Sequence, residues 1–219
     1  MSKMPRKGLH LFEYRFRILL LSGKKAFSRF TIHKSHGAYY LYNYVPIKQK
    51  GHEKQKEKKF ETDFWKFVDG DQKQYKRFLK LYYLYLLQFF WMKKIKAAYL
   101  SAVPRSSMEK KNVFADVCED LSKRNLFAYT CVKHNADLIV RTKDMMPIRL
   151  GAKYSVDDIK DSLRAGSDVS GQTVIILDDL VNSGKTARAC KDILIEAGAR
   201  EVYVLCMFAF KKQKHEYRQ

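Results

Sequence analysis

Two adjacent carboxylates stand before a short polar loop in the C-terminal half of the chain. Asp178 and Asp179 follow the apolar run 174–177, in a segment that reads VIILDDLVNSGKTARACKDILIEAGA. The apolar run is typical of a buried strand, and 186–197 has the pattern of a helix that ends at Gly198. Folds of the α/β class place anionic ligands at such a strand–loop–helix turn. The pattern therefore predicts an anion site beside two acids.

The loop after the acids carries groups that suit a phosphate. Its backbone amides and the N-terminus of the next helix supply N–H donors and a positive dipole. The hydroxyls of Ser183 and Thr186 add donors, and Gly184 lets the backbone approach a ligand closely. The residues expected to bind phosphate are Asn182, Ser183, Gly184, Lys185 and Thr186.

The run Ser183-Gly184-Lys185-Thr186 also looks like the end of a nucleotide-binding P-loop. That motif requires a glycine five positions before its second glycine, and Asp179 stands there. A carboxylate at that position would repel the phosphate. We therefore reject the P-loop. The alternative to an anion site is an ordinary αβ turn in which the two acids have no ligand-binding role.

The segment from Val174 to Thr186 resembles the phosphoribosyl-pyrophosphate (PRPP) signature of type I phosphoribosyltransferases. Like that signature, it has four apolar residues, two acids, two apolar residues and a small Ser-Gly-x-Thr loop. The resemblance implies that Asp178 and Asp179 orient the ribose, directly or through Mg²⁺, while 182–186 binds the 5′-phosphate. Asn182 departs from the Thr, Ser, Ala, Val or Asp usual at its position, although its amide still donates.

The segment Val103-Pro104-Arg105-Ser106-Ser107 resembles a second element of the same family. It stands at the end of a short strand expected over 98–103. The resemblance implies a loop for pyrophosphate, in which Arg105 stabilises the leaving group and Ser106 and Ser107 add contacts. The segment 138–155 occupies the place of the family's mobile hood, from which Arg141 or Lys143 is expected to close on pyrophosphate. Its Leu-x-x-Arg-Thr order is distantly similar to the competence-protein-F (ComF-like) branch, whose N-terminal zinc-ribbon cysteines are absent here.

This resemblance implies a phosphoribosyltransferase that uses PRPP and Mg²⁺, transfers ribose 5-phosphate to a nitrogen acceptor and releases pyrophosphate. The acceptor is not evident from the sequence. A second hypothesis is a module of this fold that binds nucleic acid or nucleotide without turnover, in a bacterial competence or phage-defence system.

Strands and helices alternate from about residue 97 onward, which predicts a parallel sheet with helices on both faces. Further strands are expected over 127–132, 136–140, 172–177 and 201–210, and a further helix over 112–121. We therefore predict an α/β phosphoribosyltransferase-like core over 97–219, preceded by a basic, aromatic α+β portion over 1–96. The latter is expected to act as a hood or a partner-binding region.

The N-terminal portion divides into three patterns. Alternation of apolar and charged residues over 12–18 and aromatic runs up to 47 predict a small β-meander, with turns at Gly23 and Gly37. The run 48–59 (KQKGHEKQKEKK) has no apolar residue and predicts an exposed loop, whereas 60–99 predicts two packed helices. The lysines proposed to grip nucleic acid are Lys54, Lys56, Lys58 and Lys59.

Charge is unevenly distributed along the chain. Residues 1–110 hold 25 Lys and Arg against 8 Asp and Glu, a net of +17, whereas residues 111–219 have a net of only +3. This asymmetry favours a polyanionic partner, either nucleic acid or an acidic protein.

The four cysteines form no C-x-x-C pair, which fits a reducing cytoplasm. The apolar stretch 81–92 is too short to span a membrane.

Overall fold

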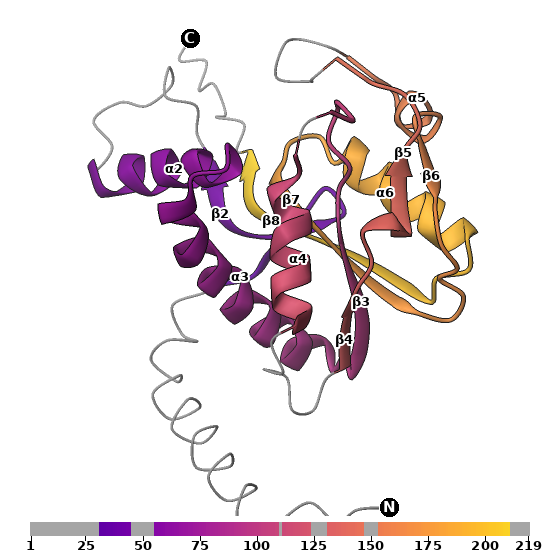
Figure 1. Cartoon of the computed structure of the whole chain (residues 1–219), viewed down its shortest axis with the longest axis horizontal. Coiled ribbons are helices and arrows are strands. Elements are labelled where there is room, and N and C mark those ends of the chain that lie inside the picture. Colours follow the sequence, from indigo (N-terminus) through magenta and orange to yellow (C-terminus); the bar gives the residue numbers. More distant parts are fainter. Residues whose placement is uncertain (1–30, 45–54, 110, 124–130, 147–152, 211–219) are drawn as a thin grey trace, which may run out of the picture. The chain divides into compact units, whose positions relative to one another are not determined.

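A six-stranded sheet forms the centre of the computed structural model, which describes residues 31–44, 55–109, 111–123, 131–146 and 153–210. Its strands run in the order β1-β2-β8-β7-β3-β4 (Figure 1), and every neighbouring pair except β1–β2 is parallel. The strands are β1 (His33–Ser35), β2 (Ala38–Tyr44), β3 (Ala97–Ala102), β4 (Cys131–His134), β7 (Thr173–Val181) and β8 (Glu201–Phe210). The predicted α/β fold is confirmed.

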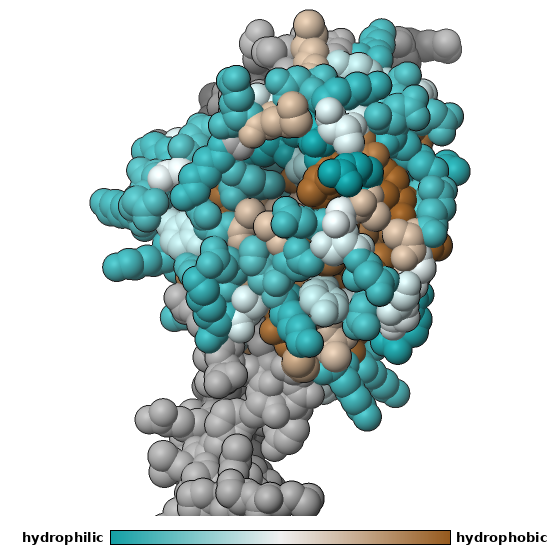
Figure 2. Space-filling view, turned by 45° about the vertical axis from the view of Figure 1, so that its right-hand side comes forward, coloured by the Kyte–Doolittle hydropathy of each residue, from teal (hydrophilic) through white to brown (hydrophobic). Residues whose placement is uncertain are grey.

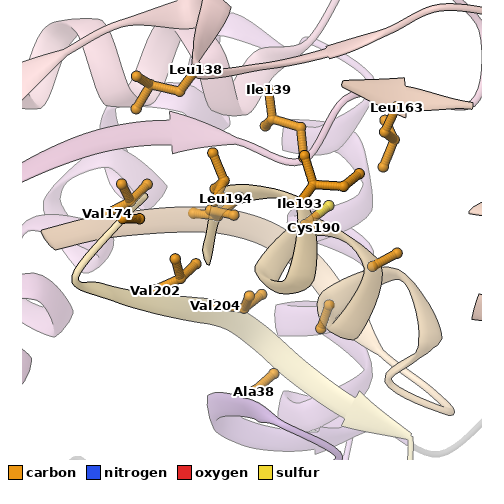
Figure 3. Close-up of a cluster of buried hydrophobic side chains, with 14 of the residues drawn as sticks. Ala38, Leu138, Ile139, Leu163, Val174, Cys190, Ile193, Leu194, Val202 and Val204 are labelled. Atoms are coloured by element: carbon orange, nitrogen blue, oxygen red, sulfur yellow. The ribbon is translucent and has the colours of Figure 1, made fainter. Parts of the chain in front are cut away.

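Both faces of this sheet are covered, as the apolar run in β7 requires. Val174 and Ile176 belong to an apolar cluster packed on α6 (Figure 3), and Ile175 and Leu177 on the opposite face are also fully buried. The helices are α2 (Gln55–Val68), α3 (Gln72–Lys93), α4 (Val113–Lys123), α5 (Val156–Lys160) and α6 (Lys185–Glu196).

Aromatic side chains of α2 and α3 form the core on the other face. Phe64 and Phe67 of α2 and Phe78 of α3 are fully buried, and the ring centroids of Phe64 and Phe208 lie 5.0 Å apart. Such tilted and edge-to-face pairs fill space and match the ring quadrupoles. The predicted pair of packed helices is therefore present.

Part of the lysine-rich run 48–59 is helical rather than a loop. Residues 55–59 form the start of α2, and 48–54 lie outside the described residues. Lys, Glu and Gln are good helix formers, so a run without apolar residues continues the amphipathic helix that follows it. Of the four lysines proposed for nucleic acid, Lys54 lies outside the described residues, while Lys56, Lys58 and Lys59 lie on α2, and Lys59 is exposed.

A tight hairpin joins β1 to β2 and brings the N-terminal half into the main sheet. His36 and Gly37 at its tip both have positive φ, 50° and 79°, as type I′ hairpin turns require. β2 then pairs with β8, so strands from before and after residue 97 share one sheet. The predicted division at residue 96 stays a prediction, and the alternation over 12–18 and Gly23 lie outside the described residues.

A separate two-stranded ribbon lies within the region predicted as the hood. β5 (Ile139–Arg141) and β6 (Leu163–Ala165) are antiparallel, and α5 lies between them in the sequence. The strand predicted over 136–140 is instead the 3₁₀ turn η2 (Ala136–Leu138) followed by β5, because the Asn135 side chain caps that turn. Residues 147–152 lie outside the described residues.

The surface on the ribbon side is mainly polar. Figure 2 shows hydrophilic side chains over most of this face, with apolar side chains visible between them. Among the described helices, none is long and apolar enough to cross a membrane.

Candidate active site

A cavity of about 800 Å³ opens at the carboxyl ends of β3, β7 and β8. Parallel strands bring their ends to one edge of the sheet, which is where ligands bind in open α/β folds. The residues proposed from sequence that line it are Arg105, Ser106, Asp178, Asp179, Asn182, Ser183, Gly184, Lys185 and Thr186. Ser107 does not line this cavity; it lines a smaller one of about 300 Å³ beside it.

The acid pair lies in the C-terminal part of the strand β7, beyond the last residue of the neighbouring strand β3. The amide of Val103 donates to the carbonyl of Leu177 at 3.0 Å, and β3 has ended one residue earlier. The Asp179 amide donates to Oδ1 of Asp178 at 2.9 Å. Burial and the charge of Asp179 raise the pKa of Asp178 well above its usual value, so this pocket favours a compensating cation or a proton there.

A tyrosine from the N-terminal half contacts the same strand end. The hydroxyl of Tyr82 on α3 donates to the backbone carbonyl of Asp178 at 3.2 Å, and its side chain is fully buried. Burial raises the pKa of Tyr82 well above its usual value, so the hydroxyl stays protonated and able to donate. No sequence pattern indicated this contact, because Tyr82 lies in a long aromatic run.

Gly184 is the N-cap of α6 and has a left-handed backbone, with φ of 75°. No side chain caps this helix in the described part of the chain, so its first amides are available to a ligand. The tip of the β1–β2 hairpin presses on this position: a Cβ at Gly184 would overlap the His36 carbonyl oxygen and lie 2.6 Å from the His36 Cβ. Glycine is therefore required both by φ and by space.

Arg105 lies on the cavity wall and is oriented by α2. Its Nη2 donates to the carbonyl of Val68, at the last residue of that helix, at 2.8 Å. The helix C-terminus carries partial negative charge, which suits the guanidinium. Arg105 has five N–H donors, so this contact leaves others for a ligand in the cavity.

Arg141 also lines the cavity, but it does not face it in the way expected from sequence. Its guanidinium donates to the backbone carbonyls of Pro104 and Arg105 and to the Ser162 hydroxyl. Burial lowers its pKa from the ordinary value. Lys143 is exposed and does not line the cavity. A contact between the hood segment and the phosphate loop is made instead by Lys185, whose Nζ donates to the Tyr154 carbonyl at 2.6 Å.

Sequence reasoning missed an aromatic wall of the cavity. Tyr44 at the end of β2, Trp65 of α2 and Phe210 at the end of β8 all line it. The Tyr44 ring lies 5.9 Å from Trp65, edge to face, and 6.3 Å from Phe210. Tyr44 and Phe210 are the last residues of two parallel strands. A search for aromatic residues at strand ends would therefore have identified these two.

The acid pair offers the kind of oxygen ligands that Mg²⁺ prefers. Asp178 and Asp179 lie together in the cavity, where burial and the neighbouring charge of Asp179 raise the pKa of Asp178. No group of three His, Cys, Asp or Glu side chains suited to a metal occurs among the described residues. The residues present therefore fit Mg²⁺ only if substrate oxygens and water complete its shell.

Comparisons with known proteins gave a family match and several solved structures of low sequence identity. The family model described as phosphoribosyl transferase domain matches residues 97–218. A comparison with curated proteins found no match. Among solved structures, hypoxanthine phosphoribosyltransferase from Trypanosoma cruzi, in complex with the product IMP, is 10% identical, with 63% of each chain covered and a TM-score of 0.37.

Two further solved structures are similar at the same level. The Staphylococcus aureus hypoxanthine phosphoribosyltransferase is 15% identical, covering 55% of this chain and 58% of that one, with a TM-score of 0.30. The purine phosphoribosyltransferase from Pyrococcus horikoshii is 15% identical, covering 59% and 81%, with a TM-score of 0.33. The chain spans less than two thirds of the length of the two hypoxanthine phosphoribosyltransferase chains.

The competence-protein-F branch is not confirmed and stays a prediction. The family model covers more than half of the chain, and the chain belongs to the phosphoribosyl transferase domain family.

Proposed function

We propose that the cavity binds PRPP with Mg²⁺ and transfers its ribose 5-phosphate group to a nitrogen acceptor, releasing pyrophosphate. The observation that carries this proposal is the meeting of three features in one cavity: the acid pair, the uncapped N-terminus of α6 and the Arg105 loop. Each suits one part of PRPP, namely the ribose, the 5′-phosphate and the diphosphate.

The chain's own residues act mainly by positioning and by charge. Asp178 and Asp179 orient the ribose hydroxyls and hold Mg²⁺, which when bound offsets the charge of the diphosphate. The amides of 182–186 fix the 5′-phosphate, and Arg105 stabilises negative charge as pyrophosphate departs. The aromatic wall excludes water on the side where an acceptor would approach.

Release of pyrophosphate from PRPP tests this proposal. The intact protein is incubated with Mg²⁺, PRPP and a panel of purine, pyrimidine and other nitrogen acceptors, and pyrophosphate is measured over time. Acceptor-dependent release supports transfer. Tight PRPP binding without release for any acceptor would instead favour a binding module. A cytoplasmic location fits the proposal, since all four cysteines are free thiols.

Arg105 provides a sharper test of the leaving-group role. Arg105→Ala should lower turnover by at least about tenfold and weaken pyrophosphate binding to a similar extent. Binding of ribose 5-phosphate, which lacks the diphosphate, should be nearly unchanged in a titration. An equal loss for both ligands would show that Arg105 supports the loop and not the leaving group.

A second candidate function, nucleic-acid binding without turnover, is favoured by the outward face of α3. This helix carries five Lys or Arg residues and no acid over 72–93. Lys73, Lys76 and Lys80 are exposed and share one face by their spacing. Trp91, 81% exposed, lies three turns beyond Lys80 on the same face. A basic stripe next to an exposed aromatic ring suits single-stranded nucleic acid.

Removing charge from this stripe should change the salt dependence of nucleic-acid binding. In Lys73→Gln/Lys80→Gln, the slope of log affinity against log salt should become shallower by about 1.4, because about 0.7 counterion is released per single-strand phosphate. The double variant Arg188→Gln/Lys191→Gln on α6, which removes the same charge elsewhere, is the control. Absence of any retention of single-stranded RNA or DNA at low salt would exclude this function.

A further inference from the structure

We propose that Arg141 is a positioning residue that sets the conformation of the pyrophosphate loop, defined as residues 103–108. This role differs from the direct contact with pyrophosphate that the sequence suggested. For its ligand, the inference rests on the proposed function; for the loop itself, it rests on hydrogen bonds within the protein.

Arg141 is the last residue of β5, and its planar guanidinium joins three acceptors. Nε donates to the carbonyl of Arg105, Nη2 to the carbonyl of Pro104 at 3.1 Å, and Nη1 to the Ser162 hydroxyl at 2.7 Å. Ser162 is fully buried and itself donates to the Ile159 carbonyl at 2.7 Å. The buried Ser162 therefore fixes the position of the guanidinium, and the guanidinium in turn fixes the carbonyls of Pro104 and Arg105. A lysine ammonium cannot reproduce this planar fork.

The same segment engages the next peptide of the loop. The amide of Met145 donates to the carbonyl of Ser106 at 2.8 Å, and the Asp144 carboxylate accepts from the amide of Met108 at 2.8 Å. Three consecutive loop carbonyls, those of 104, 105 and 106, thus accept from the segment 141–145.

The direction of those carbonyls fixes the direction of the amides. The described peptide bonds are trans, so each N–H points opposite to the carbonyl of the same peptide. The amides of Arg105, Ser106 and Ser107 therefore point away from the segment 141–145. Successive amides that point one way form an anion-binding arrangement. Pro104, Arg105 and Ser106 lie on the cavity wall, so the arrangement suits pyrophosphate oxygens.

The loop is held from a second side by the N-terminal half, through the contact of Arg105 with the Val68 carbonyl. Loss of Arg141 would leave that contact and the strand β3 in place while releasing the carbonyls. The expected consequence is local: the loop amides lose their common direction, and the 5′-phosphate loop is unaffected.

The test compares Arg141→Lys with Arg164→Lys, an exposed arginine on the partner strand β6. Pyrophosphate and ribose 5-phosphate are titrated separately in the presence of Mg²⁺. Arg141→Lys should lose at least about tenfold in pyrophosphate affinity and less than about twofold in ribose 5-phosphate affinity, and the control should change neither. Unchanged pyrophosphate affinity, or an equal loss for both ligands, would overturn the inference.

Hydrogen exchange in the ligand-free protein gives a second readout that does not depend on the proposed function. Exchange at the amides of Met108 and Met145, which donate to the Asp144 carboxylate and the Ser106 carbonyl, should be faster in Arg141→Lys than in the wild type or the control, with α6 unchanged. Equal exchange overturns the inference even if no ligand binds. If wild-type protein binds neither ligand, the proposed function fails, and exchange alone decides the role of Arg141. Should Arg141→Lys fail to fold, Ser162→Ala removes one anchor of the guanidinium and is expected to give the same pattern in weaker form.

Discussion

Replacing both Asp178 and Asp179 with Asn should nearly abolish function. Turnover is expected to fall by about a hundredfold or more, the range seen when a group that stabilises developing charge is removed. Affinity for PRPP with Mg²⁺ should fall by at least about tenfold. Asn keeps the size of each side chain but removes the negative charge that would hold the cation, so the loss reports charge rather than shape.

The control is Asp157→Asn/Asp161→Asn, which removes two exposed carboxylates near α5 that do not line the cavity. This variant should behave as the wild type in calorimetric titration with PRPP and in pyrophosphate release. Wild-type affinity in the Asp178/Asp179 variant would refute the assignment of the acids.

The raised pKa of Asp178 adds a dependence on pH. Below that pKa the carboxyl holds a proton, which competes with a cation for the same oxygens. Affinity for PRPP with Mg²⁺ should therefore increase as pH rises through the raised pKa, and this increase should be lost in Asp178→Asn. An identical pH profile in wild type and variant would show that another group titrates.

Gly184→Ala should have the second largest effect. The alanine would have to adopt a left-handed backbone and would overlap the His36 carbonyl, so either the phosphate loop or the β1–β2 hairpin must move. We expect PRPP affinity to fall by at least about tenfold, because the loop amides lose their alignment. Calorimetric titration with PRPP and with ribose 5-phosphate should show the same loss, since both carry the 5′-phosphate.

Gly171→Ala provides a matched control for this prediction. Gly171 also has a positive φ, 69°, but nothing lies within 4 Å of a Cβ built there. Both variants should lose about 1 kcal/mol or more of unfolding free energy from the strained backbone. Only Gly184→Ala should lose phosphate affinity. Equal PRPP affinities in the two variants would show that the hairpin does not position the loop.

The parts of the site that the sequence predicted are those encoded locally. Asp178, Asp179 and the loop up to Thr186 follow directly from a strand, a turn and a helix that are contiguous in the chain. Their meeting with Arg105 was predicted from the resemblance of 103–107 to the family's second element, and parallel strands that end at one edge of a sheet explain it. The sheet and its covering helices followed from hydrophobic periodicity in the same way.

The parts that were not predicted depend on contacts between distant segments. The use of Arg141 is decided by the carbonyls of Pro104 and Arg105, and side-chain to backbone contacts of this kind leave no pattern in the sequence. The close contact between His36 and Gly184 is made by residues that lie far apart in the chain. Residues 55–59 were assigned to a loop because they lack apolar side chains, yet a solvated helical turn needs none.

These contacts also change how the N-terminal half is understood. His36 meets the phosphate loop, Val68 accepts from Arg105 and Tyr82 donates to the carbonyl of Asp178. All three come from residues before 97, outside the segment matched by the family model. The N-terminal half therefore supports each of the three site elements.

Calorimetric titration of the intact protein with PRPP in the presence of Mg²⁺ tests the central claim most directly. The account predicts saturable binding at one site per chain, which is weakened in the Asp178/Asp179 variant and in Gly184→Ala but not in their matched controls. Absence of PRPP binding to the wild-type protein, or binding that both variants leave intact, would contradict it.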